Sequence, residues 1–172
     1  MRNRVRHFTP GATTDAAPAL GCSLPEAMGR FASKTFQLRG RASRSEYWWW
    51  MLVNVVVLAM TQLIIPALVS GRTPQPTLFL GPFGSALFAN IELVNVYQTD
   101  APTSPVAAFS LLFAGLWLLA TVVPGFTIAV RRLHDSNLSG WWALLAVIPP
   151  GPFVLLLLAT RRPRSDGARF DT

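Results

Sequence analysis

The chain has 172 residues and a formal net charge of +7, with 51% hydrophobic and only 13% charged residues. Soluble domains carry about 25% charged residues, so the composition excludes an ordinary soluble fold and indicates an integral membrane protein. The basic residues flank the apolar runs, so the positive charge is interpreted as setting orientation and attracting anionic lipid headgroups, and no nucleic-acid partner is expected. A single cysteine excludes an internal disulfide and a multi-cysteine zinc site.

The N-terminal part divides into a tail and a short helix. Residues 1–22 show no sustained periodicity, which predicts a disordered cytoplasmic tail, and both Met1 and Met28 remain open as translation starts. Beyond them, Leu24, Met28 and Phe31 recur at helical spacing, with basic residues elsewhere on the wheel. This pattern predicts an amphipathic helix lying in the headgroup plane, with docking on the membrane helices as the alternative.

Three apolar segments have spanning length, at 47–69, 106–130 and 141–160. The first contains 23 residues without a formal charge, and at about 1.5 Å per residue it exceeds a hydrocarbon core of about 30 Å. The third is interrupted by Pro149-Pro150-Gly151-Pro152, which predicts a helix broken near the bilayer midplane. We therefore predict an all-α integral membrane fold over 23–160, with three transmembrane helices and the N-terminal interfacial amphipathic helix.

The connection 70–105 is rich in Pro and Gly and is predicted to be an extracytoplasmic loop. Its part from 84 to 97 is apolar enough to suggest another span, but Asn90 and Glu92 oppose that, since an acid at mid-membrane depth costs about 3 kcal/mol. A helix lying on the surface is favoured there instead. Residues 161–172 are predicted to form a short, basic and mobile C-terminal tail.

The distribution of Lys and Arg predicts a multi-pass topology with the N-terminus in the cytoplasm. Eight of these residues precede the first span, and with Arg131 and Arg132 they place ten inside against five outside if all three segments cross. If the broken third segment re-enters and leaves on the same side, the split becomes fourteen against one. Each half of that segment has only eight or nine residues, too few for a full hairpin leg, so three spans are predicted and re-entry is the alternative.

Two polar groups flank the spans at the same predicted membrane depth. The first polar group is Arg39, Arg41, Arg44 and Glu46, and the second polar group is Arg131, Arg132, His134 and Asp135. Cations at the C-terminal end of a helix interact favourably with its dipole. We predict that Glu46 pairs with Arg131 or Arg132. We also predict that Asp135 pairs with an arginine of the first polar group, so that both groups latch the helices on the cytoplasmic side.

Three motifs stand in order beside the spans: Gly40-Arg41-Ala42-Ser43-Arg44-Ser45-Glu46-Tyr47-Trp48, Arg131-Arg132-Leu133-His134-Asp135, and Ser139-Gly140-Trp141-Trp142 with Pro149 beyond. Over roughly 31–170 the chain thereby resembles the DUF805 family of small bacterial inner-membrane proteins. The closing Gly, Asn, Arg, aromatic pattern of the family is only partly present in Gly167-Ala168-Arg169-Phe170, where Asn is missing. The resemblance implies an inner-membrane fold of three to four helices and supplies no catalytic residues, because the family has no assigned function.

No enzymatic, metal or cofactor chemistry is expected from these residues. Zinc usually takes four ligands, and the chain has only two histidines, His7 and His134. Catalysis needs a nucleophile, a base and an orienting group held together, and Ser136 and Ser139 share a tight turn with His134. A tight turn of this kind rarely permits that geometry.

The sequence therefore favours a non-enzymatic inner-membrane protein. Its polar groups would latch the helices and bind anionic headgroups, a membrane-protein partner or a second copy of the chain. The alternative is a small transporter or ion-coupled carrier, with a path lined by Asn54 at the broken third helix. Since no spanning segment contains an acid or base that could carry a proton, the alternative is the less favoured of the two.

Overall fold

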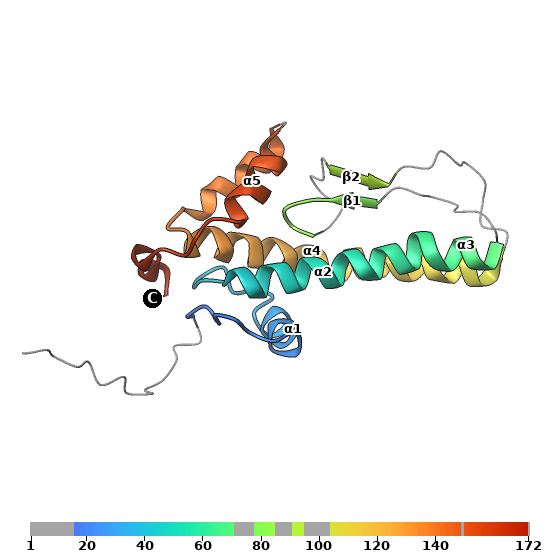
Figure 1. Ribbon diagram of the computed structural model, residues 1–172, viewed down its shortest axis with the longest axis horizontal. Coiled ribbons are helices and arrows are strands. Elements are labelled where there is room, and N and C mark those ends of the chain that lie inside the picture. Colours follow the sequence, from blue (N-terminus) through green and yellow to red (C-terminus); the bar gives the residue numbers. More distant parts are fainter. Residues whose placement is uncertain (1–15, 71–77, 85–90, 95–103, 149, 172) are drawn as a thin grey trace, which may run out of the picture.

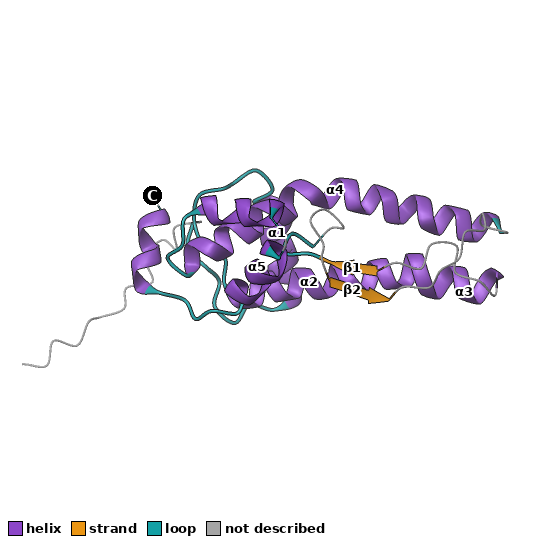
Figure 2. Ribbon diagram, turned by 90° about the horizontal axis from the view of Figure 1, so that it is seen from above, coloured by secondary structure: helices purple, strands orange, loops and turns teal. Residues whose placement is uncertain are grey.

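The computed structural model describes residues 16–70, 78–84, 91–94, 104–148 and 150–171. Two long helical rods run antiparallel and side by side, and a shorter helical pair projects from one end of them (Figures 1 and 2). By length and composition, the rods Arg44–Val69 and Pro105–Asp135 can each cross a membrane, with 26 and 31 residues. The helical membrane fold expected from the sequence is present in this core.

The first rod consists of α2 (Arg44–Ala59), a π-helical turn, η1 (Met60–Ile64), and α3 (Ile65–Ser70). A capping box starts it, as Ser43-Arg44-Ser45-Glu46 favours. The backbone N–H of Glu46 donates to Ser43 Oγ at 3.2 Å, and that of Ser43 donates to Glu46 Oε2 at 2.7 Å. The helix predicted for the first apolar segment is therefore continuous.

The second rod is α4 (Pro105–Asp135), whose start is capped by Ser104 Oγ, an acceptor for the N–H of Val106 at 3.2 Å. The helix predicted over 106–130 is confirmed, but it continues for one more turn at its C-terminal end. The second polar group therefore belongs to the last turn of this helix and not to a loop between helices.

Both rods expose apolar side chains on their outer faces. Leu68 of the first rod is 81% exposed, and Leu119 of the second is 74% exposed. An exposed apolar surface of this extent is unfavourable in water, whereas hydrocarbon covers it without cost. The helices therefore differ from core helices of a soluble protein, which would turn such residues inward.

The third apolar segment folds back on itself. The 3-10 helix η2 (Gly140–Val147) and α5 (Gly151–Ala159) pack against each other and against α4, as the orange and red ribbons in Figure 1 show. A Cβ at Gly151 would collide with Leu145 O, so only glycine permits so tight a reversal. The prediction of a third, broken span over 141–160 is not confirmed, because η2 and α5 fold back on each other at the Pro-Gly break, which is the arrangement of the re-entrant alternative.

The connection between the rods contains a short antiparallel pair, β1 (Leu78–Leu80) and β2 (Ile91–Val94), with Leu80 opposite Ile91. The surface helix favoured over 84–97 is wrong for the residues of β2; its other residues, apart from Gly84, lie outside the described part of the chain. Ile and Val are β-branched and favour a strand once a partner strand is available.

Residues 81–84, here called the plug segment, return from the far end of the rods and are buried between them. Tyr47 OH donates to Pro82 O at 2.6 Å, and Asn54 Nδ2 donates to Gly84 O. A Cβ on Gly125 of α4 would collide with Phe83 O. Part of the connection predicted to be an extracytoplasmic loop thus packs against the helices, where its carbonyls accept hydrogen bonds from buried donors.

The N-terminal helix α1 (Leu24–Ser33) forms as the periodicity predicts and docks on α2. The Phe31 and Trp50 rings stack, with centroids 3.9 Å apart and planes 17° apart. Figure 1 looks down the axis of α1 while α2 runs horizontally, so α1 crosses the rod. Of the two alternatives for this helix, the structure shows docking on the long helices.

Both ends of the described chain pack at the α1 end of the rods. Arg41 N donates to Ala16 O at 2.9 Å, and Trp49 Nε1 donates to Cys22 O at 3.0 Å. The prediction of disorder is thus wrong for 16–22, while 1–15 lie outside the described residues. In the C-terminal tail, which the sequence predicted to be mobile, the 3-10 helix η3 (Ser165–Phe170) packs against the end of α4.

Candidate functional site

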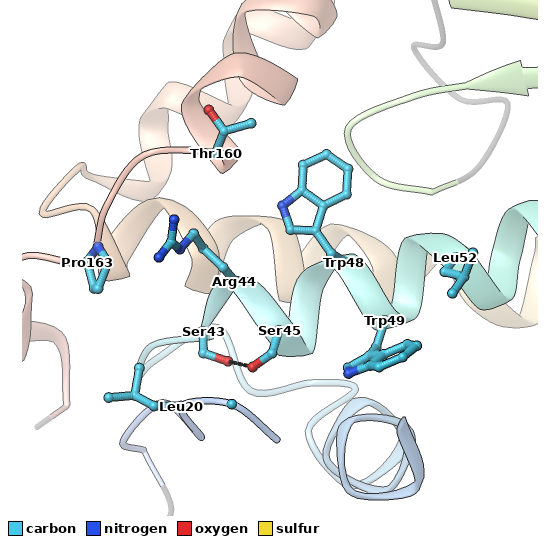
Figure 3. Close-up of a pocket in the computed structure, with 10 residues that line it drawn as sticks. Leu20, Ser43, Arg44, Ser45, Trp48, Trp49, Leu52, Thr160 and Pro163 are labelled. Atoms are coloured by element: carbon cyan, nitrogen blue, oxygen red, sulfur yellow. Dashed lines mark hydrogen bonds between the residues drawn. The ribbon is translucent and has the colours of Figure 1, made fainter. Parts of the chain in front are cut away.

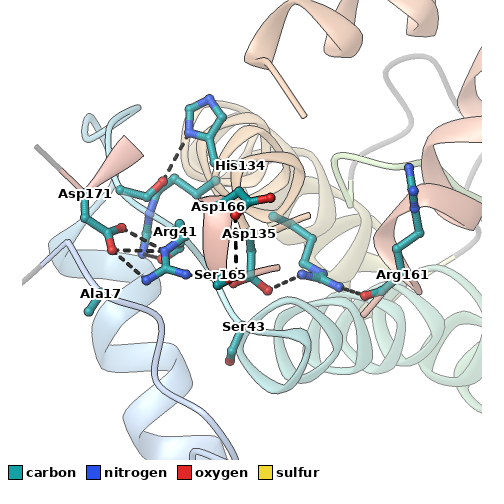
Figure 4. A network of polar contacts seen from close by, with 12 residues as sticks. Ala17, Arg41, Ser43, His134, Asp135, Arg161, Ser165, Asp166 and Asp171 are labelled. Atoms are coloured by element: carbon teal, nitrogen blue, oxygen red, sulfur yellow. Dashed lines mark hydrogen bonds and ion pairs between the residues drawn. The ribbon is translucent and has the colours of Figure 1, made fainter. Parts of the chain in front are cut away.

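The second polar group is buried at the end of α4 (Figure 4). Arg131 is 2% exposed, Arg132 is 1% exposed and Asp135 is completely buried. Removing a charge from water costs several kcal/mol unless the charge is paired and hydrogen-bonded. The partners of these side chains therefore decide what the group does.

Arg132 joins α4 to the end of the helical pair formed by η2 and α5. Its Nη1 forms an ion pair with Asp135 Oδ2, one turn along the same helix. Its Nε donates to Ala159 O at 2.9 Å, and its Nη2 donates to Arg161 O. Ala159 O is among the carbonyls that the C-terminal end of α5 leaves unpaired, and Arg161 O follows just after the helix, so one guanidinium neutralises an acid and caps a helix.

Asp135 lies between two cations. Arg132 occupies one carboxylate oxygen, and Arg41 Nη1 lies 4.0 Å from the other. The prediction that Asp135 pairs with an arginine of the first polar group is therefore confirmed for Arg41. Arg41 also binds Asp171, with Nη2 2.6 Å from Oδ2, and so links the acid of α4 to the C-terminal segment.

Arg131 holds the chain that leads into α2. Its Nη2 donates to Arg41 O at 2.9 Å, and its own carbonyl accepts from the N–H of Ala42 at 3.0 Å. The segment before α2 thus lies along the last turn of α4. We call Arg41, Arg131, Arg132 and Asp135 the latch, since together they connect four segments of the chain.

Glu46 does not pair with Arg131 or Arg132, so that part of the sequence prediction is wrong. Its Oε1 pairs with Arg30 Nε of α1. The physical reason is that the capping box fixes Oε2 on the N–H of Ser43, and α1 then brings Arg30 to the other oxygen. From the sequence, Arg30 was expected only to be one of the basic residues outside the apolar face of this helix.

His134 contacts both the segment before α2 and the C-terminal segment. Its Nδ1 lies 3.1 Å from Gly40 O, and its ring stacks on Phe170 with centroids 4.0 Å apart. A carbonyl can only accept a hydrogen bond, so Nδ1 carries the proton. Gly40 N in turn donates to Phe170 O at 2.7 Å. Ser139 Oγ caps η2 by accepting from Trp141 N at 3.4 Å.

Arg39 and Arg44 of the first polar group are exposed and form neither a hydrogen bond nor an ion pair within the described ranges. Within the same ranges, no cluster of three or more His, Cys, Asp and Glu residues is placed to hold a metal ion. The structure therefore brings five of the eight predicted residues together at the end of α4, pairs Glu46 with Arg30 instead, and leaves two arginines at the surface.

The site also includes residues that the sequence did not single out. Asp171 binds Arg41, Phe170 covers His134, and a Cβ on Gly167 would collide with His134 O. The partial match of Gly167-Ala168-Arg169-Phe170 to the closing pattern of the family was the available signal. No local periodicity reveals that this segment returns to α4.

Asn54 is enclosed, although the transporter alternative would have it line a path. Its Nδ2 donates to Gly84 O, and its Oδ1 accepts from Trp117 Nε1 at 3.0 Å. The cavity beside Tyr47 and Arg132 has a volume of about 10 Å³. This is at most the space of one water molecule, so this cavity holds no solute.

An open groove of about 740 Å³ lies beside the latch, over the start of α2 (Figure 3). Arg44, Trp48 and Leu52 project from α2 along it. Leu20 and Gly21 form one wall of the groove, and Thr160 and Pro163 form the other. The groove is thus the concave surface next to the buried polar network.

Comparison with known proteins agrees with a membrane location. A family model described as "Protein of unknown function (DUF805)" matches residues 35–172. Inner membrane protein YhaI of Escherichia coli (strain K12) is 33% identical over 132 residues, which cover 76% of this chain and 80% of that protein. Inner membrane protein YhaH of the same strain is 27% identical over 111 residues, 64% of each chain. No solved structure matches. The family model covers most of the chain and the relatives are inner-membrane proteins, so this protein belongs to the DUF805 family.

Proposed function

We propose that this protein is a non-enzymatic structural protein of the inner membrane, whose latch holds its helices in a fixed arrangement at the cytoplasmic face. One observation carries the proposal: the buried charges of the latch bind each other and backbone carbonyls of other segments. Arg132 alone connects α4 to Ala159 and Arg161. Groups used in this way join elements and do not face a reactant.

The topology that we propose has two spans and one re-entrant pair, with both chain ends inside. It is supported by the eleven Lys and Arg residues of the described ranges, which belong to the segments gathered at the latch end. The positive-inside rule assigns such an end to the cytoplasm. The latch contacts between Arg132 and the end of α5 support the same arrangement, because they return the chain to the side it left.

We further propose that α1 lies along the inner membrane surface while docked on α2. Its crosswise orientation supports this (Figure 1). Phe36, just after the helix, is 86% exposed, and Leu38 is 49% exposed. Apolar side chains beside basic ones are typical of segments in the headgroup region.

Contacts with anionic lipids or a protein partner would be made by exposed cations around the latch. The latch arginines themselves are buried, except for Arg41, which is partly exposed. Arg39, Arg44 and Arg162 are exposed at the same end. This separates the structural role of the polar groups from their binding role.

The latch is tested by Arg132→Lys, which keeps the charge but removes the planar fork that reaches two carbonyls. We expect the purified protein in detergent to lose about 1.5–3 kcal/mol of stability, the range for hydrogen bonds to a charged group. Thermal unfolding measures the loss, and Arg162→Lys at an exposed position is the matched control. An unchanged melting temperature in Arg132→Lys would contradict the latch.

The assignment of a structural role is tested in proteoliposomes that contain the full chain. We expect ion and solute flux equal to that of protein-free liposomes. Reproducible flux that disappears in Gly151→Ala, which obstructs the reversal between η2 and α5, would overturn the structural role in favour of transport.

A further inference from the structure

We infer that the groove over the start of α2 binds an anionic phospholipid, with Arg44 contacting the phosphate. The inference rests on the proposed function, because it takes the latch end as the cytoplasmic membrane face. It adds a binding site, a ligand class and the residues that recognise the ligand.

The groove combines a charged end with an apolar floor (Figure 3). The ten lining residues are Leu20, Gly21, Ser43, Arg44, Ser45, Trp48, Trp49, Leu52, Thr160 and Pro163. None of them is acidic, so no carboxylate in the lining competes for Arg44. Arg161 and Arg162 stand between the wall residues Thr160 and Pro163 in the sequence.

Two hydrogen-bond donors of the groove lack a partner among the described residues. Arg44 is exposed, and Trp48 is 38% exposed; neither donates a hydrogen bond there. The other polar groups of the lining are already engaged: Ser43 Oγ and Ser45 Oγ lie 2.9 Å apart, and Trp49 Nε1 donates to Cys22 O. The groove therefore offers one guanidinium and one indole N–H, one helical turn apart, to an acceptor such as a phosphate.

The surface below the groove distinguishes a lipid from a soluble phosphate. Every fourth residue of the first rod is exposed, in the order Arg44, Trp48, Leu52, Val56, Met60, Ile64 and Leu68. Positions four apart lie along one side of a helix. The stripe thus changes from a cation to an indole and then to aliphatic side chains.

The dimensions of this stripe fit one leaflet. The helix rises by about 18 Å over the twelve steps from Arg44 to Val56, and half of a hydrocarbon core is about 15 Å. A phosphate held at Arg44 would place its acyl chains along Leu52 and Val56, which are 50% and 47% exposed. A soluble anion would use the arginine alone and leave this apolar surface uncovered.

Native mass spectrometry of the full chain in detergent, titrated with phosphatidylglycerol, tests the site. We expect Arg44→Gln to weaken binding by about fivefold, the factor that corresponds to about 1 kcal/mol for one cation at an anionic surface. Trp48→Phe keeps the ring but removes the N–H, and should weaken binding to a smaller extent. Arg39→Gln removes another exposed arginine, one that does not line the groove, and should weaken binding less than Arg44→Gln does.

Three results would overturn the inference. The first is wild-type phosphatidylglycerol binding in both Arg44→Gln and Trp48→Phe, with melting temperatures showing that both variants are folded. The second is equally tight binding of phosphatidylethanolamine, and the third is displacement of the lipid by inorganic phosphate, which would assign the groove to a soluble anion. Because these measurements are made in detergent, they do not depend on the stability of Arg132→Lys or on topology, so the site and the proposed function can fail separately.

Discussion

Glu46 serves two elements at once, because each of its carboxylate oxygens has a different partner. One oxygen completes the capping box of α2 by accepting from Ser43 N, and the other pairs with Arg30 of α1. Its side chain is only 2% exposed. Burial of a carboxylate costs free energy that its hydrogen bonds and ion pair must offset, so this residue couples the start of a membrane helix to the docking of a surface helix.

Replacement of Glu46 separates these two interactions. Glu46→Gln keeps an oxygen for the capping box and removes the ion pair, whereas Glu46→Ala removes both. We expect stability to fall from the wild type to Glu46→Gln, and by about 1 kcal/mol more in Glu46→Ala through the lost cap. Thermal unfolding in detergent measures both steps.

The control for this series is Glu26→Gln at the exposed start of α1. Ser23 precedes that helix, but its side chain makes no capping bond there. No change in melting temperature is expected. Equal stabilities of Glu46→Gln and Glu46→Ala would show that the capping box contributes nothing.

At the scale of elements, close approach of the backbone decides where segments pack. The plug segment reaches α4 at Gly125 and α2 at Trp50, and Gly84 there has φ +74. An added Cβ on Gly84 would lie 2.8 Å from Trp50 Nε1. Irregular backbone at membrane depth must be buried in protein, and these glycines provide the necessary space.

Gly125→Ala tests this packing directly. Its Cβ would collide with Phe83 O, so we expect a loss of about 1–3 kcal/mol, the usual cost of overpacking. Gly115→Ala is the matched control in the same helix, since nothing lies within 4 Å of its added Cβ. That variant should be neutral or slightly more stable, because Ala favours a helix over Gly. Equal melting temperatures of the two variants would contradict the close contact between the plug segment and the rods.

For the whole molecule, the direction of the third apolar segment decides the topology. Arg164 N donates to Asp135 O at 2.9 Å, so the chain beyond α5 returns to the end of α4 from which η2 departs. A latch on one side of the membrane requires this return. It also gathers the arginines of the described N- and C-terminal segments at one end of the rods.

Topology reporters fused after Asn137 and after Thr172 test this arrangement. We expect both fusions to report the cytoplasm, since the pair η2–α5 re-enters and leaves on the same side. A fluorescent protein that folds only in the cytoplasm and a phosphatase active only outside it provide complementary readouts. Opposite locations for the two fusions would favour three full spans. They would also contradict the contact between Arg132 and Arg161, which needs both on one side of the membrane.

The sequence by itself determined the local features. Apolar length predicted the two rods, Ser43 and Glu46 predicted the cap of α2, and the Pro-Gly run predicted the break before Gly151. These follow from periodicity, capping chemistry and backbone restrictions, which act over a few residues. The membrane class followed from composition for the same reason.

Only the tertiary structure decided which segments meet. Glu46 pairs with Arg30 and not with Arg132, and the plug segment turns inward to satisfy Tyr47 and Asn54. The chain reverses at the break before Gly151 because the C-terminal end of α5 is bound to α4. Several partners of suitable charge or hydrogen-bonding capacity exist for each of these groups, and the choice among them depends on how the whole chain packs.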